Sequence, residues 1–284
     1  MPTETPTQTY QGMFRLKKPI HIWTPDGGYN APRLIATAKT PPSMDFEQAA
    51  EYLRKQSPRQ RHLTFGESFQ AMLALEGDEE GMTIAEDMVA GVYERTGTIA
   101  VFKGARKSDD GSFYHGCVVQ TPLFDADGHM ISENGIPKGR DSWEMALPAK
   151  NGYAKDLPKD CDTFLNTVYG MEGARKKLPG NAFVLAWPEG ELNNLLRGSW
   201  SCGRRENRRV YANGDWGPSD SIEDVASRGA SDNARFVNKL NDAVYAASTE
   251  ALLKELEQAP PEQAAPIIDR INKQLNGALV WEDI

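Results

Sequence analysis

The chain has 284 residues, 39% of them hydrophobic, so it can bury a sizeable core in one large domain or two smaller ones. Its 40 acidic residues outnumber its 32 lysines and arginines, and the resulting net charge of -8 disfavours nucleic acid as a partner. The longest apolar run, residues 182–187, is too short to cross a bilayer, which excludes a membrane-inserted protein.

The beginning of the sequence predicts a flexible tail over residues 1–11, which are polar and rich in Pro and Thr. A small mixed β/α element is expected over residues 12–95. Short apolar runs around the turn residues 25–28 predict strands in its first part. Apolar residues recur at helical spacing over residues 44–56, and the capping-box spacing of residues 64–67 predicts the start of a second helix.

The middle of the chain, residues 96–232, alternates strand-like runs with long stretches rich in Gly, Pro, Asp and Asn. Turn signals at Asp110-Gly111 and Asp127-Gly128 predict hairpins, and the fold class we expect is an irregular, loop-rich α+β domain. Residues 233–284 carry two apolar helical stripes separated by Pro260-Pro261. They predict a C-terminal helical hairpin that packs on the core or against a neighbouring subunit.

The cysteines and charged clusters predict no catalytic residue, no metal site and no cofactor. The three cysteines, Cys117, Cys161 and Cys202, form no Cys-x-x-Cys motif, which indicates a reducing compartment or an assembly that needs no disulfides. His115 would share a strand face with Cys117, where imidazole could activate a thiolate, but a half-buried strand is the favoured interpretation. Residues 125–128 suggest a calcium loop, yet the remaining ligands of an EF-hand are missing, so a hairpin turn is favoured.

One stretch, residues 201–227, has the composition of a binding surface. From Ser201 to Ala230 the sequence holds five arginines and five acidic residues, and this balance argues against a phosphate-binding strip. Tyr, Trp, Arg, Ser, Asn and Gly dominate it, as in antibody-type binding loops, although an ordinary surface loop is the alternative. The candidate ligand-binding residues are Ser201, Cys202, Arg204, Arg205, Glu206, Asn207, Arg209, Tyr211, Asn213, Asp215, Trp216, Ser219, Asp220 and Ser221.

The arrangement of motifs in this stretch resembles a known family. The motifs are Arg197-Gly198-Ser199-Trp200, Arg208 or Arg209 followed by Ala212, Asp215-Trp216 with Pro218, and Val225-Ala226-Ser227-Arg228. They resemble the C-terminal segment of the formylglycine-generating-enzyme-like branch of the C-type lectin fold. More narrowly, they are similar to the variable proteins of diversity-generating retroelements, found in phages, prophages and bacteria.

This resemblance implies a C-type-lectin-like ligand-binding domain over residues 96–232, with a hypervariable face on a fixed scaffold. It also implies scaffold roles for Arg197, Trp200 and Arg228, since a large apolar anchor and two guanidinium forks suit the flanks of such a face. The sequence departs from the family pattern at two places. One Gly of the usual Arg-Gly-Gly-Ser-Trp is absent, and Ala226-Ser227-Arg228 stands where Gly-Phe-Arg is usual.

The leading functional hypothesis is a non-catalytic recognition protein, such as a receptor-binding component of a phage or prophage. It would be synthesised in the cytoplasm, since the sequence opens without a signal peptide, and could become virion-associated. Its partner would be a protein or glycan on a target surface, and homo-oligomerisation would raise avidity. Two alternatives stay open: a copper oxidase similar to formylglycine-generating enzymes, and a structural adaptor of a virion.

Overall fold

The computed structural model describes most of the chain between residues 12 and 231. Within this range the residues that are not described are 57–58, 77, 90–92, 126, 179–182, 186–195, 206–208, 215–218 and 222–224. For residues 183–185, 196–205 and 209–213 the structure describes the backbone alone. The predicted N-terminal tail and C-terminal helical hairpin lie outside the described residues. In the described part of the chain, no helix has both the length and the apolar character needed to span a membrane.

The described fold is mixed α+β, in agreement with the predicted class. The helices are α1 (Phe46–Arg54), α2 (Phe65–Leu75), α3 (Met82–Val89), α4 (Asp162–Tyr169) and α5 (Ala174–Lys177), with 3-10 turns η1 (Ala154–Asp156) and η2 (Lys159–Cys161). The strands are β1 (Met13–Arg15), β2 (His21–Ile22), β3 (Tyr29–Asn30), β4 (Leu34–Lys39), β5 (Arg61–His62), β6 (Tyr93–Val101), β7 (Arg106–Lys107), β8 (Phe113–Pro122), β9 (Ser132–Glu133), β10 (Ile136–Pro137), β11 (Gly139–Pro148), β12 (Gly152–Tyr153), β13 (Phe183–Leu185), β14 (Leu196–Arg205), β15 (Arg209–Asn213) and β16 (Val225–Ser231).

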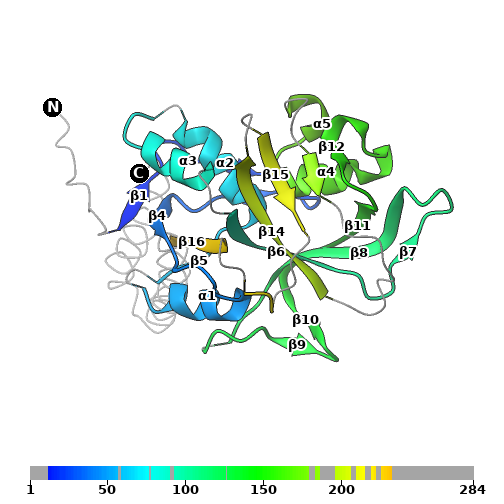
Figure 1. Ribbon diagram of the computed structural model, residues 1–284, viewed down its shortest axis with the longest axis horizontal. Helices are drawn as coiled ribbons and strands as arrows, with labels where there is room; N and C mark the ends of the chain where they lie inside the picture. Colours follow the sequence, from blue (N-terminus) through cyan, green and yellow to red (C-terminus); the bar gives the residue numbers. More distant parts are fainter. Residues whose placement is uncertain are drawn as a thin grey trace, which may run out of the picture. The chain divides into compact units, whose positions relative to one another are not determined.

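Most of these strands join one large sheet, in which β6 has a central place (Figure 1). The main path runs β1-β4-β16-β6-β14-β15-β13-β12, and β8 joins β6 to β7 and β11. Its pairs are antiparallel except for β16 with β6 and β13 with β15, which are parallel. Strands far apart in the sequence therefore meet at β6.

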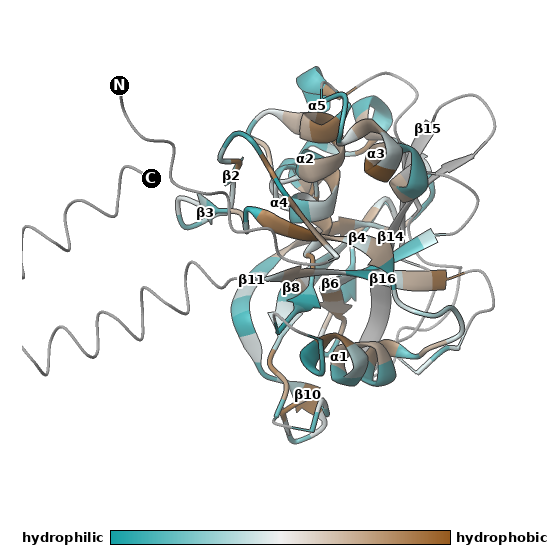
Figure 2. Ribbon diagram, turned by 90° about the vertical axis from the view of Figure 1, so that its left-hand side faces the viewer, coloured by the Kyte–Doolittle hydropathy of each residue, from teal (hydrophilic) through white to brown (hydrophobic). Residues whose placement is uncertain are grey.

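The sheet separates two layers of helices, as Figure 2 shows, with α2, α3, α4 and α5 on one side and α1 on the other. The side chains of β6 pack into both helix layers, because successive side chains of a strand point to opposite faces of the sheet. Ala100 belongs to the large apolar cluster that includes the buried side chains of α2 and α4. Ile99 and Val101 pack instead with Phe46 of α1 in a smaller cluster.

The local predictions for helix starts and turns are confirmed. Thr64 caps α2, and Glu67 closes the capping box, with both reciprocal hydrogen bonds present. The turn residues 25–28 separate β2 from β3, Asp110-Gly111 lies between β7 and β8, and Asp127-Gly128 lies inside the Phe124–Met130 bridge. Each of these features depends on residues a few positions apart.

The expectation that His115 and Cys117 share a strand face is wrong. Cys117 is fully buried, whereas His115 is exposed. The pairing of β8 with β11 shifts register here, from Met145 opposite Cys117 to Leu147 opposite Tyr114, and Gly116 has a φ of 69°. This bulge inserts an extra residue between the two side chains and breaks the alternation that the prediction assumed.

The predicted boundary between residues 95 and 96 falls inside β6. Residues up to Ser231 form one compact unit. Within it, β16 pairs with β4 and β5 from the N-terminal part and with β6 that crosses the boundary. The N-terminal element and the central region thus share one sheet.

Candidate functional site

The candidate site is segment 201–227, the stretch whose composition predicts ligand binding. Ser201, Cys202, Arg204 and Arg205 lie in β14 together with the candidate scaffold residues Arg197 and Trp200, and Arg209, Tyr211 and Asn213 lie in β15. Ser219, Asp220 and Ser221 are exposed on a loop before β16. The expectation of a surface that extends to residue 227 is wrong at its end, because residues 225–227 are buried in β16 within the sheet. Glu206, Asn207, Asp215 and Trp216 lie outside the described residues.

The backbone of the site is an antiparallel hairpin built into the sheet. Its register runs from Ser201 opposite Asn213 to Arg205 opposite Arg209. On one side β14 pairs with β6, and on the other β15 pairs in parallel with β13. The outer edges of the hairpin therefore have a neighbouring strand at residues 201–202 and 211–213, which restrains the backbone at its base independently of the residue types that it carries.

The two ends of segment 201–227 meet at the same two residues of β6. Across the antiparallel pair, Arg95 lies opposite Ser201 and Glu94 opposite Cys202. Across the parallel pair, Arg95 is the partner of Ser227, and Glu94 is the partner of Ala226. The two ends of the segment thus lie in the sheet on opposite sides of Glu94 and Arg95, which close its base.

A buried ion cluster lies under this base. Arg228 is 1% exposed, and its Nε donates to Glu94 Oε1 at 2.7 Å and its Nη1 to the carbonyl of Ala36 at 2.7 Å. Its Nη2 donates to the carboxylate of Asp87 from α3. Burial by itself would lower the pKa of Arg228, but the Glu94 and Asp87 carboxylates outweigh it and raise the pKa above its ordinary value.

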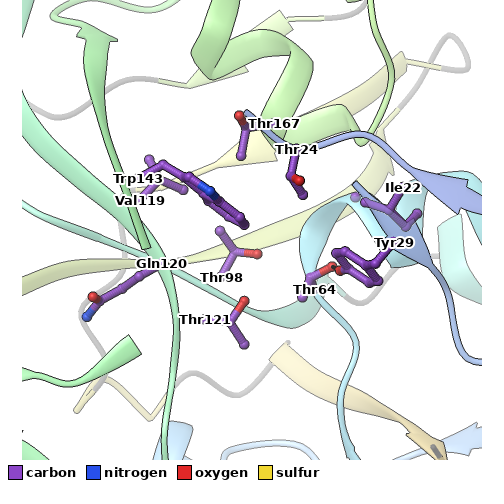
Figure 3. Close-up of a pocket in the computed structure, with 11 residues that line it drawn as sticks. Ile22, Thr24, Tyr29, Thr64, Thr98, Val119, Gln120, Thr121, Trp143 and Thr167 are labelled. Atoms are coloured by element: carbon purple, nitrogen blue, oxygen red, sulfur yellow. Dashed lines mark hydrogen bonds between the residues drawn. The ribbon is translucent and has the colours of Figure 1, made fainter. Parts of the chain in front are cut away.

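A second candidate is a small pocket on the α2 side of the sheet, shown in Figure 3. Its lining combines threonines with the indole of Trp143 and the ring of Tyr29, and it comprises Ile22, Thr24, Tyr29, Thr64, Gly66, Thr98, Val119, Gln120, Thr121, Trp143 and Thr167. The cavity has a volume of about 20 Å³, which is room for about one water molecule. Thr64 and Thr98 already accept hydrogen bonds from the first turn of α2. The pocket is therefore better explained as part of the packing around this helix end.

Among the residues that the structure describes, two groups have the chemistry of metal ligands, and neither is arranged as a built site. Asp125, Asp127 and His129 bring ligand atoms within 4.8 Å of one another, but all three are exposed and Asp125 Oδ1 accepts from the backbone of its own turn. The thiols of Cys117 and Cys161 are buried, and burial raises the pKa of each to about 12. Neutral thiols are poor nucleophiles.

Comparison of the chain with protein-family models, with curated proteins and with solved structures gave no match. The function of the site is therefore inferred from the geometry of its own residues.

Sequence reasoning missed the residues at the base of the site. Glu94 and Arg95 lie shortly before the apolar run of residues 99–102, and an adjacent pair of opposite charges so close to a predicted strand is an unusual pattern that could have pointed to buried partners. Asp87 carried no signal of this kind. Its partner Arg228 lies 141 positions away, a distance at which sequence spacing says nothing about contact.

Proposed function

We propose that this protein is a non-catalytic ligand-recognition protein that presents segment 201–227 as its binding surface on a C-type-lectin-like scaffold. One observation supports this most: both ends of the segment pair with Glu94 and Arg95, above the buried Arg228–Glu94 ion pair. A surface held in this way at its base can change its outward residues at little cost in stability. This is the property that a diversified recognition surface needs.

The exposed loop of the segment agrees with a recognition role. Ser219, Asp220 and Ser221 offer hydroxyl and carboxylate groups to solvent, which suits a protein or glycan ligand on a target surface. The motif resemblance to variable proteins of diversity-generating retroelements favours the same function. The proposal includes homo-oligomerisation, because several linked copies would raise avidity. It also includes association with a phage or prophage particle.

The copper-oxidase alternative is less well supported. It requires a pair of cysteines to hold copper, and Cys117, Cys161 and Cys202 form no pair at a recognisable motif position. The side chain of Cys202 lies outside the described residues. The virion-adaptor alternative differs from recognition in that it predicts no dependence of binding on segment 201–227.

The experiment that tests the proposal is a pair of displayed libraries in the full chain. The first randomises three hairpin positions that the register places on one face, Arg205, Arg209 and Tyr211, and the second randomises the buried β6 positions 99–101. We expect most members of the hairpin library to fold with melting temperatures within about 5 °C of the parent, and selection against an unrelated protein to yield binders. The core library should mostly fail to fold. Equal loss of folding in both libraries would contradict the proposal.

A further inference from the structure

We infer that Arg95 is a positioning residue of the proposed binding surface, which sets the conformation of loop 219–221 from beneath by holding its backbone. The inference rests on the proposed function of segment 201–227. It adds that the shape which a ligand meets depends on a side chain that the ligand does not touch.

The contacts of Arg95 place it under the loop. Arg95 is 1% exposed, whereas Ser219, Asp220 and Ser221 are all exposed. Its Nη2 donates to the backbone carbonyl of Asp220 at 2.6 Å, across 125 positions of sequence. The same residue lies in register with Ser201 and Ser227, the two ends of the segment. Arg95 therefore joins the base of the segment to its outer loop.

The charges around Arg95 favour this placement. Burial lowers the pKa of the guanidinium, while the carboxylates of Asp220 and Asp45 favour its charged form. Asp45 is the N-cap of α1, whose side chain accepts a hydrogen bond from the backbone of Gln48. The guanidinium thus lies in the field of a fixed helix cap on one side and the surface loop on the other. A charged donor binds a carbonyl more strongly than a neutral one does.

Arg95 can position a variable surface because its hydrogen-bond acceptor in the loop is a backbone atom. Arg95 holds a backbone carbonyl, which every residue type provides, so the contact survives changes of the side chain at position 220. Arg228 has a different role, because its partners Glu94, Asp87 and Ala36 all lie outside segment 201–227. Loss of Arg95 should therefore loosen the loop, whereas loss of Arg228 should weaken the sheet.

The first test measures amide hydrogen exchange of the full chain in three variants. In Arg95→Gln we expect the amides of residues 219–221 to exchange about tenfold faster, and in Arg95→Lys, which keeps one charged donor, about threefold faster. Arg175→Gln is the matched control, since Arg175 holds the carbonyls of Ala154, Leu157 and Pro158 in another loop. It should speed exchange at residues 154–157 and leave residues 219–221 unchanged.

The second test uses a single-domain antibody raised against the folded chain, with an epitope mapped to Ser219 and Ser221. We expect Arg95→Gln to weaken its binding about tenfold although the antibody cannot reach a residue buried under the loop, and Arg95→Lys to retain affinity within about threefold. Should Arg95→Gln fail to fold, the exchange rate of Arg95→Lys decides. Unchanged exchange at residues 219–221 and unchanged antibody affinity would overturn the inference. The exchange result is independent of whether the hairpin library yields binders, so this failure and that of the proposed function are distinguishable.

Discussion

The two faces of β6 use buried charge in different ways. On the face covered by α2 and α3, Glu94 pairs with Arg228 and lies within reach of Ser68, so this charge is balanced inside the core. On the face covered by α1, Arg95 donates outward to the loop carbonyl of Asp220. One residue step along a strand therefore separates a charge that holds the sheet together from a charge that shapes its surface.

The largest expected effect comes from breaking the core pair. Glu94→Met removes the partner of Arg228 Nε and leaves a buried cation incompletely compensated, which should lower the free energy of unfolding by about 3–5 kcal/mol. Urea denaturation measures this loss. The double variant Glu94→Met/Arg228→Met should recover part of it, because no unpaired charge is then left at the site. The pair is not coupled if the free energy of unfolding lost in the double variant equals the sum of the losses in the two single variants. That result would contradict the contrast between Glu94 and Arg95.

An intermediate effect is expected from the α1 face as the pH falls. His62 is buried against Phe46, with ring centroids 4.7 Å apart, and burial lowers its pKa from 6.5 to about 3. The unfolded chain therefore binds a proton between these values that the folded chain does not, so His62 stabilises above pH 6.5 and this contribution is lost as the pH falls toward 3. At pH 5 the loss should be about 2 kcal/mol relative to pH 7.5, measured by chemical denaturation at both values.

The control for this pH dependence is His62→Phe, which keeps an aromatic ring in the stack. It should show a smaller loss of stability between pH 7.5 and pH 5 than the parent chain. An equally steep loss in the variant would assign the effect to other groups.

The smallest expected effect is at the surface loop itself. Ser219→Ala and Ser221→Ala change exposed side chains while Arg95 still holds the backbone between them, so the free energy of unfolding should change by no more than about 0.5 kcal/mol. Thermal unfolding checks this. A loss above about 2 kcal/mol would mean that these serines are part of the core packing and would remove the contrast between base and surface.

Several elements of the fold were predictable because their causes are local. The capping box of Thr64 and Glu67 and the turn at Asp110-Gly111 depend on residues within four positions, and both occur as expected. Helices α3 and α4 were not predicted, although Phe164, Leu165, Val168 and Tyr169 recur at helical spacing in α4, and both helices pack against α2. The face shared by His115 and Cys117 was mispredicted, because a bulge at Gly116 is set by the pairing of β8 with β11 and leaves little trace in spacing.

The candidate site was predictable in composition and unpredictable in construction. Segment 201–227 stands out by its arginines, aromatics and small polar residues, and the exposure of Ser219, Asp220 and Ser221 agrees with a surface. Nothing in its spacing pointed to Glu94 and Arg95 as its base. The register that joins them to Ser201 and Ser227 spans more than a hundred positions of sequence.

What the sequence by itself determined, then, is local: where helices are capped, where the chain turns, and which stretch carries binding-type residues. These follow from backbone hydrogen bonding and side-chain chemistry within a few residues. Only the tertiary structure decided that β14 and β16 flank β6 and that a buried arginine reaches the outer loop. Such contacts depend on strand pairing between distant segments, whose free energy comes from burying the whole sheet between its helices and leaves no fixed spacing in the chain.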